Sequence, residues 1–151
     1  MKGKIKLDEI DYKIMNLLYE NARMPIAEIG RNISMTQPAV KERVQKLEDH
    51  GVIAGYKARF NAAKIDKEIM AFVMFKTTQC VDFVHFCEAS YQVTDLYRIG
   101  GEFNYMMKVM TDSMQSLAKF LDSLMKFGLA SPLIVLKNEF EEKLVLGDKC
   151  K

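Results

Sequence analysis

The first fifty residues place apolar side chains at the period of an α-helix. In the first segment the apolar positions follow an i, i+4, i+7, i+8 spacing: Ile10, Ile14, Leu17 and Leu18. This spacing collects the side chains on one face and predicts a helix from about Asp8 to Asn21, with Asp8 as its N-cap. Pro25 fits the first turn of a second helix, expected over 26–32, because a first-turn amide needs no partner within the helix.

A third helix is predicted to begin after Thr36, whose hydroxyl is expected to accept a backbone N–H, and to end at His50-Gly51. Pro38 is tolerated in its first turn. Steps of four and three residues bring Val40, Val44 and Leu47 onto an inner face. The outward positions are then Pro38, Lys41, Glu42, Gln45 and Asp49, with Arg43 and Lys46 on the flanks.

The residues after the third helix change character twice. Val52–Phe60 alternates apolar side chains with Lys57 and Arg59, which predicts a short hairpin or wing. Residues 61–68 are polar and unpatterned, which predicts a linker. We therefore expect a winged helix-turn-helix domain over 1–60, the linker over 61–68, and a second domain with a C-terminal tail over 69–151.

The second half predicts strands and helices in the order β-α-β-β-α-β, typical of a ferredoxin-like α/β sandwich. Gly100-Gly101 marks the turn between the middle strands. The expected strands are Ile69–Thr77, Val93–Ile99, Tyr105–Thr111 and Leu133–Phe140, and the expected helices are Val81–Ser90 and Met114–Phe127. The fold class is thus α+β.

Both faces of the expected strands are apolar. In the first strand Ala71, Val73 and Phe75 alternate with Met70, Phe72 and Met74. Two helices cover only one face of a four-stranded sheet in this topology, so the other face needs a partner. A second copy of the chain is the simplest one, and the pattern predicts a homodimer.

Helix, tight turn and helix over residues 26–51 form the layout of a helix-turn-helix, whose second helix can enter a DNA major groove. A plain helical hairpin has the same pattern, and Glu42 and Asp49 would repel phosphate. The exposed Gln and Lys side chains favour DNA, and residues 1–64 carry 12 Lys/Arg against 8 Asp/Glu. Base contacts are expected from Gln37, Pro38, Lys41, Glu42 and Gln45, and phosphate contacts from Arg43, Lys46, Lys57 and Arg59. Thr36, at the start of the same helix, is also expected to contact DNA.

Other chemistry is weakly represented. The chain has an odd number of cysteines, without a C-x-x-C spacing: Cys80, Cys87 and Cys150. Its two histidines, His50 and His85, lie far apart. We therefore expect neither a disulfide framework nor a metal site. No nucleophile, phosphate loop or His and carboxylate cluster suggests an enzyme, and no cofactor is expected. Without an apolar run of about 18 residues or a signal peptide, the protein is expected to be cytoplasmic and free of membrane contact.

The chain resembles a known family through several motifs together. The segment LDEIDYKIMNLLYENARMPIAEIGRNISMTQPAVKERVQKLEDHGVIAGY is similar to the N-terminal domain of the Lrp/AsnC, or feast/famine, regulators. YRIGGEFNYMMKV resembles the strand–turn–strand segment of that family, which includes a G-x-Y-D turn. The similarity covers about residues 7–146.

This resemblance implies a transcription regulator with a winged helix-turn-helix and an α/β sandwich. It also implies dimers that pair through their sheets, often assembled into octamers, and often an amino-acid effector near the turn. Gly101, Glu102, Phe103 and Asn104 occupy that turn here. Phe103 replaces the Tyr and Asn104 replaces the Asp, which exchanges a carboxylate for a neutral amide. The exchange leaves open a different effector, weak binding, or no effector at all, with the turn only a tight bend between strands.

Two other classes remain open from the residues. An RNA-binding module shares the β-α-β-β-α-β order, but Phe103 and Tyr105 lack the aromatic spacing of RNA-recognition strands and Met fills the exposed positions. A metabolite-sensing oligomeric subunit without DNA-binding activity is the main alternative to a DNA-binding regulator.

Overall fold

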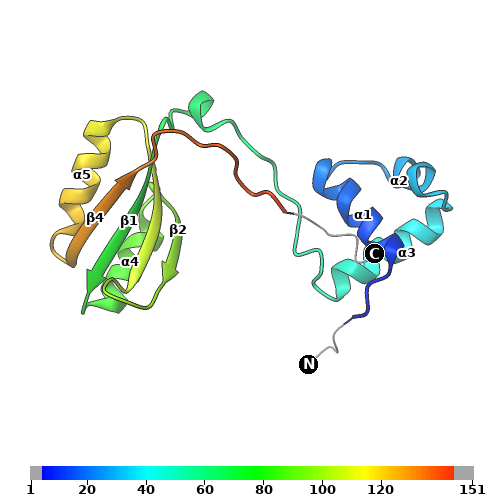
Figure 1. Cartoon of the computed structure of the whole chain (residues 1–151), viewed down its shortest axis with the longest axis horizontal. Coiled ribbons are helices and arrows are strands. Elements are labelled where there is room, and N and C mark those ends of the chain that lie inside the picture. Colours follow the sequence, from blue (N-terminus) through cyan, green and yellow to red (C-terminus); the bar gives the residue numbers. More distant parts are fainter. Residues whose placement is uncertain (1–4, 145–151) are drawn as a thin grey trace. The chain divides into compact units, whose positions relative to one another are not determined.

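The computed structural model describes residues 5–144, which form two compact units (Figure 1). The first unit takes residues up to Arg59 together with the described residues from Glu142, and the second is Phe60–Glu141. Each has its own apolar core. Cys150 lies outside the described residues.

Three helices make up the first unit: α1 (Glu9–Glu20), α2 (Ile26–Ile33) and α3 (Gln37–Asp49). Asp8 caps α1, as the sequence predicts, and Pro25 precedes α2. The core joins one apolar face from each helix and centres on Ile14, Ile29, Val40, Val44 and Leu47. Thr36 is the N-cap residue of α3, but its hydroxyl makes no capping hydrogen bond.

The predicted hairpin over Val52–Phe60 is wrong, because these residues contain no strand. The amides of Val52 and Ile53 instead donate to the carbonyl of Leu47, at 2.9 and 3.2 Å. These two side chains pack against the three-helix core. From residue 54 to residue 60 the backbone is exposed and has no pairing strand, so a β-ladder cannot form.

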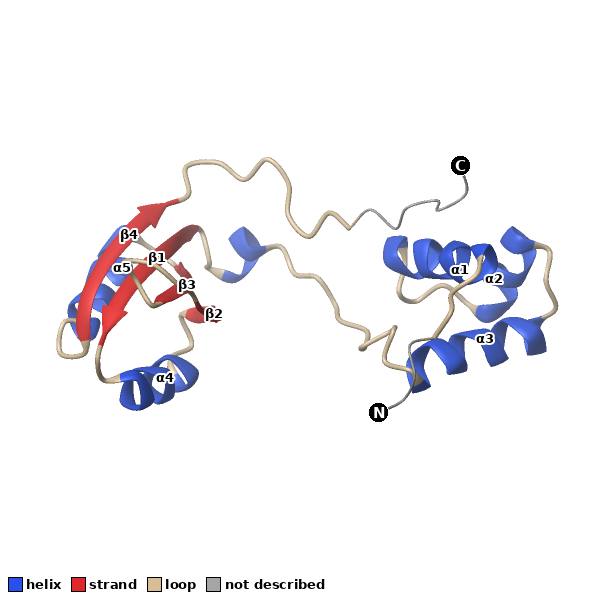
Figure 2. Cartoon of the chain, turned by 60° about the horizontal axis from the view of Figure 1, so that its bottom comes forward, coloured by secondary structure: helices blue, strands red, loops and turns tan. Residues whose placement is uncertain are grey.

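A four-stranded antiparallel sheet with strand order β2-β3-β1-β4 forms the second unit (Figure 2). Its strands are β1 (Ile69–Thr77), β2 (Val93–Arg98), β3 (Tyr105–Thr111) and β4 (Gly128–Ile134), and its α-helices are α4 (Cys80–Ala89) and α5 (Met114–Leu124). A short 3-10 helix, η1 (Ala62–Ile65), lies in the predicted linker. The sequence placed β1 and β3 with these same bounds.

The predicted position of the last strand is wrong by about five residues. It was expected over Leu133–Phe140, whereas β4 pairs Gly128 with Thr77 and Ile134 with Ala71. A Cβ on Gly128 would lie 2.1 Å from the carbonyl oxygen of Lys76, so only glycine permits this approach. Helix α5 accordingly ends at Leu124 rather than at Phe127. Pro132 is tolerated because β4 is an edge strand.

One face of the sheet is covered by α4 and α5. Phe75 of β1 stacks on Phe83 of α4, with ring centroids 4.3 Å apart. Leu117, Phe120 and Leu124 of α5 join the same core. The opposite face, called the open face below, carries side chains that are half-buried or exposed: Met70, Phe72, Met74, Tyr97, Met106, Met110, Leu129 and Leu133. None of the helices in residues 5–144 has the length and apolar character needed to cross a membrane.

Candidate DNA-binding surface and effector site

Helix α3 has one buried side and one exposed side. Val40 and Leu47 are at most 1% exposed, which fixes the side that faces the core. The residues expected to contact DNA from this helix gather on the exposed side: Gln37, Pro38, Lys41, Glu42, Gln45 and Lys46. Thr36 is exposed at the start of α3. The helix thus presents amide and ammonium groups of the kind that contact base edges and phosphates.

The turn between α2 and α3 is held by a close backbone approach. Ser34 adopts the left-handed conformation, with φ of 56°, and the amide of Met35 donates to the carbonyl of Gly30 at 2.8 Å. A Cβ on Gly30 would lie 2.6 Å from the carbonyl oxygen of Met35. Glycine is therefore required where α2 meets this turn, and the turn sets the start of α3.

Two contacts order the C-terminal half of α3. The amide nitrogen of Gln45 donates to Asp49 at 3.1 Å, along the exposed side of the helix. Tyr56 donates its hydroxyl to Glu48 at 2.7 Å, and burial together with this carboxylate raises the pKa of Tyr56 to about 12. Tyr56 therefore ties the exposed segment after α3 back to the helix.

Lys57 and Arg59 lie on this exposed segment rather than on a β-hairpin. The Arg59 Nε atom is 3.5 Å from a carboxylate oxygen of Glu142, and both side chains are about three-quarters exposed. An ion pair this exposed contributes little and breaks readily. Both cations are thus exposed, although no rigid wing presents them.

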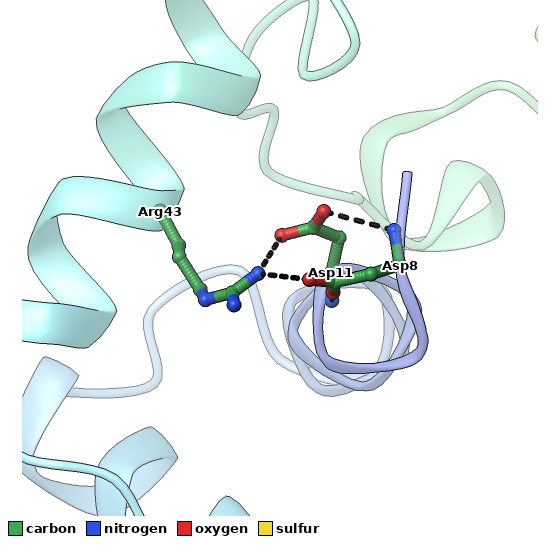
Figure 3. A network of polar contacts seen from close by, with 3 residues as sticks. All are labelled: Asp8, Asp11 and Arg43. Carbon is green, nitrogen blue, oxygen red and sulfur yellow. Dashed lines mark hydrogen bonds and ion pairs between the residues drawn. The ribbon is translucent and has the colours of Figure 1, made fainter. Parts of the chain in front are cut away.

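Arg43 differs from the other predicted phosphate contacts. Its Nη1 atom donates to Asp8 and to Asp11, each at 2.8 Å (Figure 3). These ion pairs raise the pKa of Arg43 above its usual value, and the Asp8 hydrogen bond is the largest cause. Sequence reasoning placed Arg43 on the flank of the helix but missed these two partners. The acidic first turn of α1 was the available signal, although no local pattern pairs it with Arg43.

The predicted effector turn lies between β2 and β3. Gly101 has a φ of 120°, which favours glycine, and the amide of Ile99 donates to the carbonyl of Asn104 at 3.1 Å. Asn104 turns towards the end of β1: its oxygen accepts from the amide of Thr77 at 3.0 Å, and its nitrogen donates to the Thr77 carbonyl at 2.7 Å. The side chain therefore binds backbone, in the manner of one more step of the β-ladder.

An open hollow of about 560 Å³ adjoins this turn. Gly101, Glu102 and Asn104 line it, whereas Phe103 does not. The end of β1 and the residues after α5 supply the rest, which sequence reasoning missed because these segments are distant in sequence: Lys76, Thr77, Thr78, Gln79, Met125, Lys126, Phe127 and Gly128. Cations and a carboxylate around one hollow suit a small ligand that carries both charges. Within residues 5–144 no group of three His, Cys, Asp or Glu is placed to hold a metal ion.

Family models match both units. The AsnC-type helix-turn-helix domain matches residues 7–48, and the Lrp/AsnC ligand binding domain matches residues 70–142. The chain belongs to the Lrp/AsnC family. Its relatives in this family are HTH-type transcriptional regulators, and the uncharacterized regulator YezC of Bacillus subtilis (strain 168) is 34% identical over 132 residues. That match covers 87% of this chain and 95% of YezC.

Solved Lrp/AsnC structures share the fold. Bacillus subtilis LrpC superposes with a TM-score of 0.85 at 26% identity, covering 92% of this chain and all of LrpC. The Neisseria meningitidis transcriptional regulator NMB0573, in its complex with L-Met, has a TM-score of 0.88 at 24% identity and covers 93% of this chain and 97% of its own. The expected family and the two-part fold are thereby confirmed.

Proposed function

We propose that this Lrp/AsnC chain binds duplex DNA through α3 in the major groove. The observation that carries the proposal is the exposed face of α3 opposite the buried Val40, Val44 and Leu47. Base edges are contacted by Gln37, Pro38, Lys41, Glu42 and Gln45, and phosphates by Lys46, Lys57 and Arg59. Thr36, at the start of α3, is a further DNA contact. Amides and ammonium groups suit adenine and guanine edges, and Glu42 can accept from cytosine.

Selection of bound sequences from a pool of random duplex DNA tests this proposal. The full-length protein should enrich a site with two-fold symmetry, and binding to random duplex should weaken steeply as salt rises. Lys41→Ala should then weaken binding to the enriched site by about tenfold and relax its sequence preference. A protein that enriches nothing and binds no duplex at low salt would instead be a sensing subunit without DNA-binding activity.

The proposed DNA-binding unit is a homodimer or an assembly of dimers that meet through the open face. This face gathers methionine, leucine and aromatic side chains, and both Leu129 and Leu133 are more than half exposed in the single chain. Contiguous apolar surface of this kind is covered in stable proteins. A second copy covers it symmetrically and supplies a second α3 for the other half of a two-fold site.

Mass in solution tests the dimer. Phe72→Glu places a charge in the middle of the open face and should convert the assembly to monomers at micromolar concentration. Val81→Glu is the matched control, because Val81 is 69% exposed on α4, away from the open face, and should leave the mass unchanged. A Phe72→Glu protein with the mass of the unmodified assembly would place the interface elsewhere.

We further propose that the hollow beside the 101–104 turn binds an amino acid or a related small molecule. Glu102 supplies the carboxylate for an ammonium group, and Lys76 and Lys126 supply cations for a carboxylate. Asn104 shapes the hollow, because its amide is already bonded to Thr77. Binding of ligand to one arrangement of the assembly then shifts the occupancy of DNA sites.

Thermal unfolding with a panel of amino acids tests the effector. A ligand at a hundred times its dissociation constant should stabilise the folded protein by about 2.7 kcal/mol. Glu102→Gln should abolish that stabilisation, whereas Glu88→Gln, at an exposed position of α4, should preserve it. Equal stabilisation of both variants would exclude Glu102 from the site.

A further inference from the structure

A nearly buried carboxylate marks the start of α1. The side chain of Asp11 is only 7% exposed, and a buried charge is costly unless hydrogen bonds and an opposite charge compensate it. Part of the compensation is local. Asp11 and Asp8 form a reciprocal capping box, in which the Asp11 amide donates to Asp8 at 2.9 Å and the Asp8 amide donates to Asp11 at 3.1 Å. Each carboxylate then has one oxygen left over.

A single nitrogen of Arg43 donates to both of the remaining carboxylate oxygens. Its Nη1 atom donates to Asp8 Oδ2 and to Asp11 Oδ1, whereas the two capping amides use Asp8 Oδ1 and Asp11 Oδ2. All four carboxylate oxygens therefore have a donor, and α3 is tied to the first turn of α1 (Figure 3). Charge-assisted hydrogen bonds of this length are strong and directional.

The apolar contacts of α3 lack that directionality. Val40, Val44 and Leu47 hold the helix against the core, but apolar burial has no preferred direction and so fixes the rotation of the helix about its axis less sharply than directional hydrogen bonds do. Arg43 lies on the flank between the buried and exposed sides, where such a rotation moves it most directly away from the carboxylates. Rotating α3 by about 20° at a side-chain radius of about 6 Å moves exposed groups by about 2 Å. That displacement is enough to break hydrogen bonds to base edges.

We infer that Arg43 is a positioning residue, which fixes the rotation of α3 and thereby aims Gln37, Lys41 and Gln45 at the bases, and that it is not a phosphate contact. This inference rests on the proposed binding of DNA. The charge of Arg43 agrees with it, because one guanidinium between two carboxylates leaves a formal charge of −1. The cluster as a whole therefore offers no attraction to DNA.

The test compares four single substitutions in the full-length protein: Arg43→Gln, Asp11→Asn, Asp8→Asn and, as the control on the same helix, Lys46→Gln. A fifth variant combines Arg43→Gln with Asp11→Asn. Two probes are used, namely the duplex that the unmodified protein enriches from a random pool and a duplex of random sequence. Affinity for each is measured across a salt series. Circular dichroism and thermal unfolding establish that each variant is folded at the temperature of the measurement.

Arg43→Gln should weaken binding to the enriched duplex by about tenfold or more. It should leave binding to random duplex, and the dependence of affinity on salt, nearly unchanged. Asp11→Asn should reproduce this loss of discrimination although it removes a negative charge, and Arg43→Gln with Asp11→Asn should cost little more than either alone. Lys46→Gln should weaken binding to both probes alike and reduce the salt slope by about 0.9 per subunit, hence by about 1.8 for a dimer.

The opposite pattern overturns the inference. If Arg43 contacts phosphate, Arg43→Gln will behave like Lys46→Gln, and Asp11→Asn will strengthen binding to both probes by releasing the cation. If Asp11→Asn fails to fold, Asp8→Asn separates the same two explanations. The Asp8 side chain is 54% exposed, so this variant is expected to fold. If the unmodified protein binds neither probe at low salt, the proposed function fails, and that result is distinct from retained discrimination in Arg43→Gln.

Discussion

Replacing Gly30 by alanine sets two physical effects against each other. Gly30 lies inside α2, where alanine is better than glycine by about 1 kcal/mol from helix propensity alone. The packing points the other way, because the new Cβ would lie 2.6 Å from the carbonyl oxygen of Met35, against 3.4 Å for an ordinary contact. The two segments must separate by about 0.8 Å, and the hydrogen bond from Met35 to Gly30 crosses the same gap.

The clash should outweigh the propensity. Forcing a carbon atom into a well-packed site costs about 1–3 kcal/mol, and here the obstacle is backbone, which cannot rotate away. We expect a net destabilisation of about 1–2 kcal/mol, confined to the three-helix unit. The start of α3 should shift with the turn, so affinity for an enriched DNA site should fall as well.

Hydrogen–deuterium exchange in the full-length chain measures this effect locally. Amides of α1, α2 and α3 should exchange about 5–30 times faster in Gly30→Ala, with the amides of β1 and β3 unaffected. Gly100→Ala is the matched control, because no heavy atom lies within 4 Å of its Cβ position. Slower exchange in the helices of Gly30→Ala would refute the packing argument and leave propensity as the dominant effect.

Three further outcomes follow from the polar contacts. The hydrogen bond from the Asp11 amide, and then Arg43, lower the pKa of Asp8 below 3.8. The ionised Asp8 therefore stabilises the folded protein above pH 3.8, and this stabilisation is lost as pH falls through the lowered pKa. In chemical unfolding at acid pH, Asp8→Asn should flatten this loss of stability. Iodoacetamide should label Cys80 faster than Cys87. Hydrogen bonds with Tyr105 and then Arg98 lower the pKa of Cys80, whereas burial raises the pKa of Cys87 to about 11. Equal labelling rates would contradict this. Asn104→Asp should destabilise the sheet by about 1–2 kcal/mol in thermal unfolding, since a carboxylate cannot donate to Thr77.

Local patterns in the sequence were sufficient for much of the fold. Asp8 caps α1 because a carboxylate at that position accepts an amide whatever the rest of the chain does. The strands β1 and β3 were placed with their observed bounds because their apolar side chains continue along both faces and stop at polar residues. The exposed side of α3 followed from helix geometry alone.

The errors arose where contacts outside the local hydrophobic pattern decide the structure. The start of β4 depends on Gly128, because only glycine can approach the backbone of Lys76 in β1 so closely. Val52 and Ile53 are β-branched, as strand residues often are, but their amides donate to the Leu47 carbonyl of α3 instead. The ion pairs of Arg43 join positions 32 and 35 residues apart, and no local period reveals them.

The place of β1 in the sheet also sets an order of events during synthesis. The three helices rest largely on contacts between neighbouring segments, which form quickly. β1, by contrast, pairs with β3 and with β4, so its second edge stays unpaired until the chain has grown past Ile134. A nascent chain can therefore complete α1–α3 well before it has a finished sheet, and its methionine-rich open face is complete only after β4 has been added.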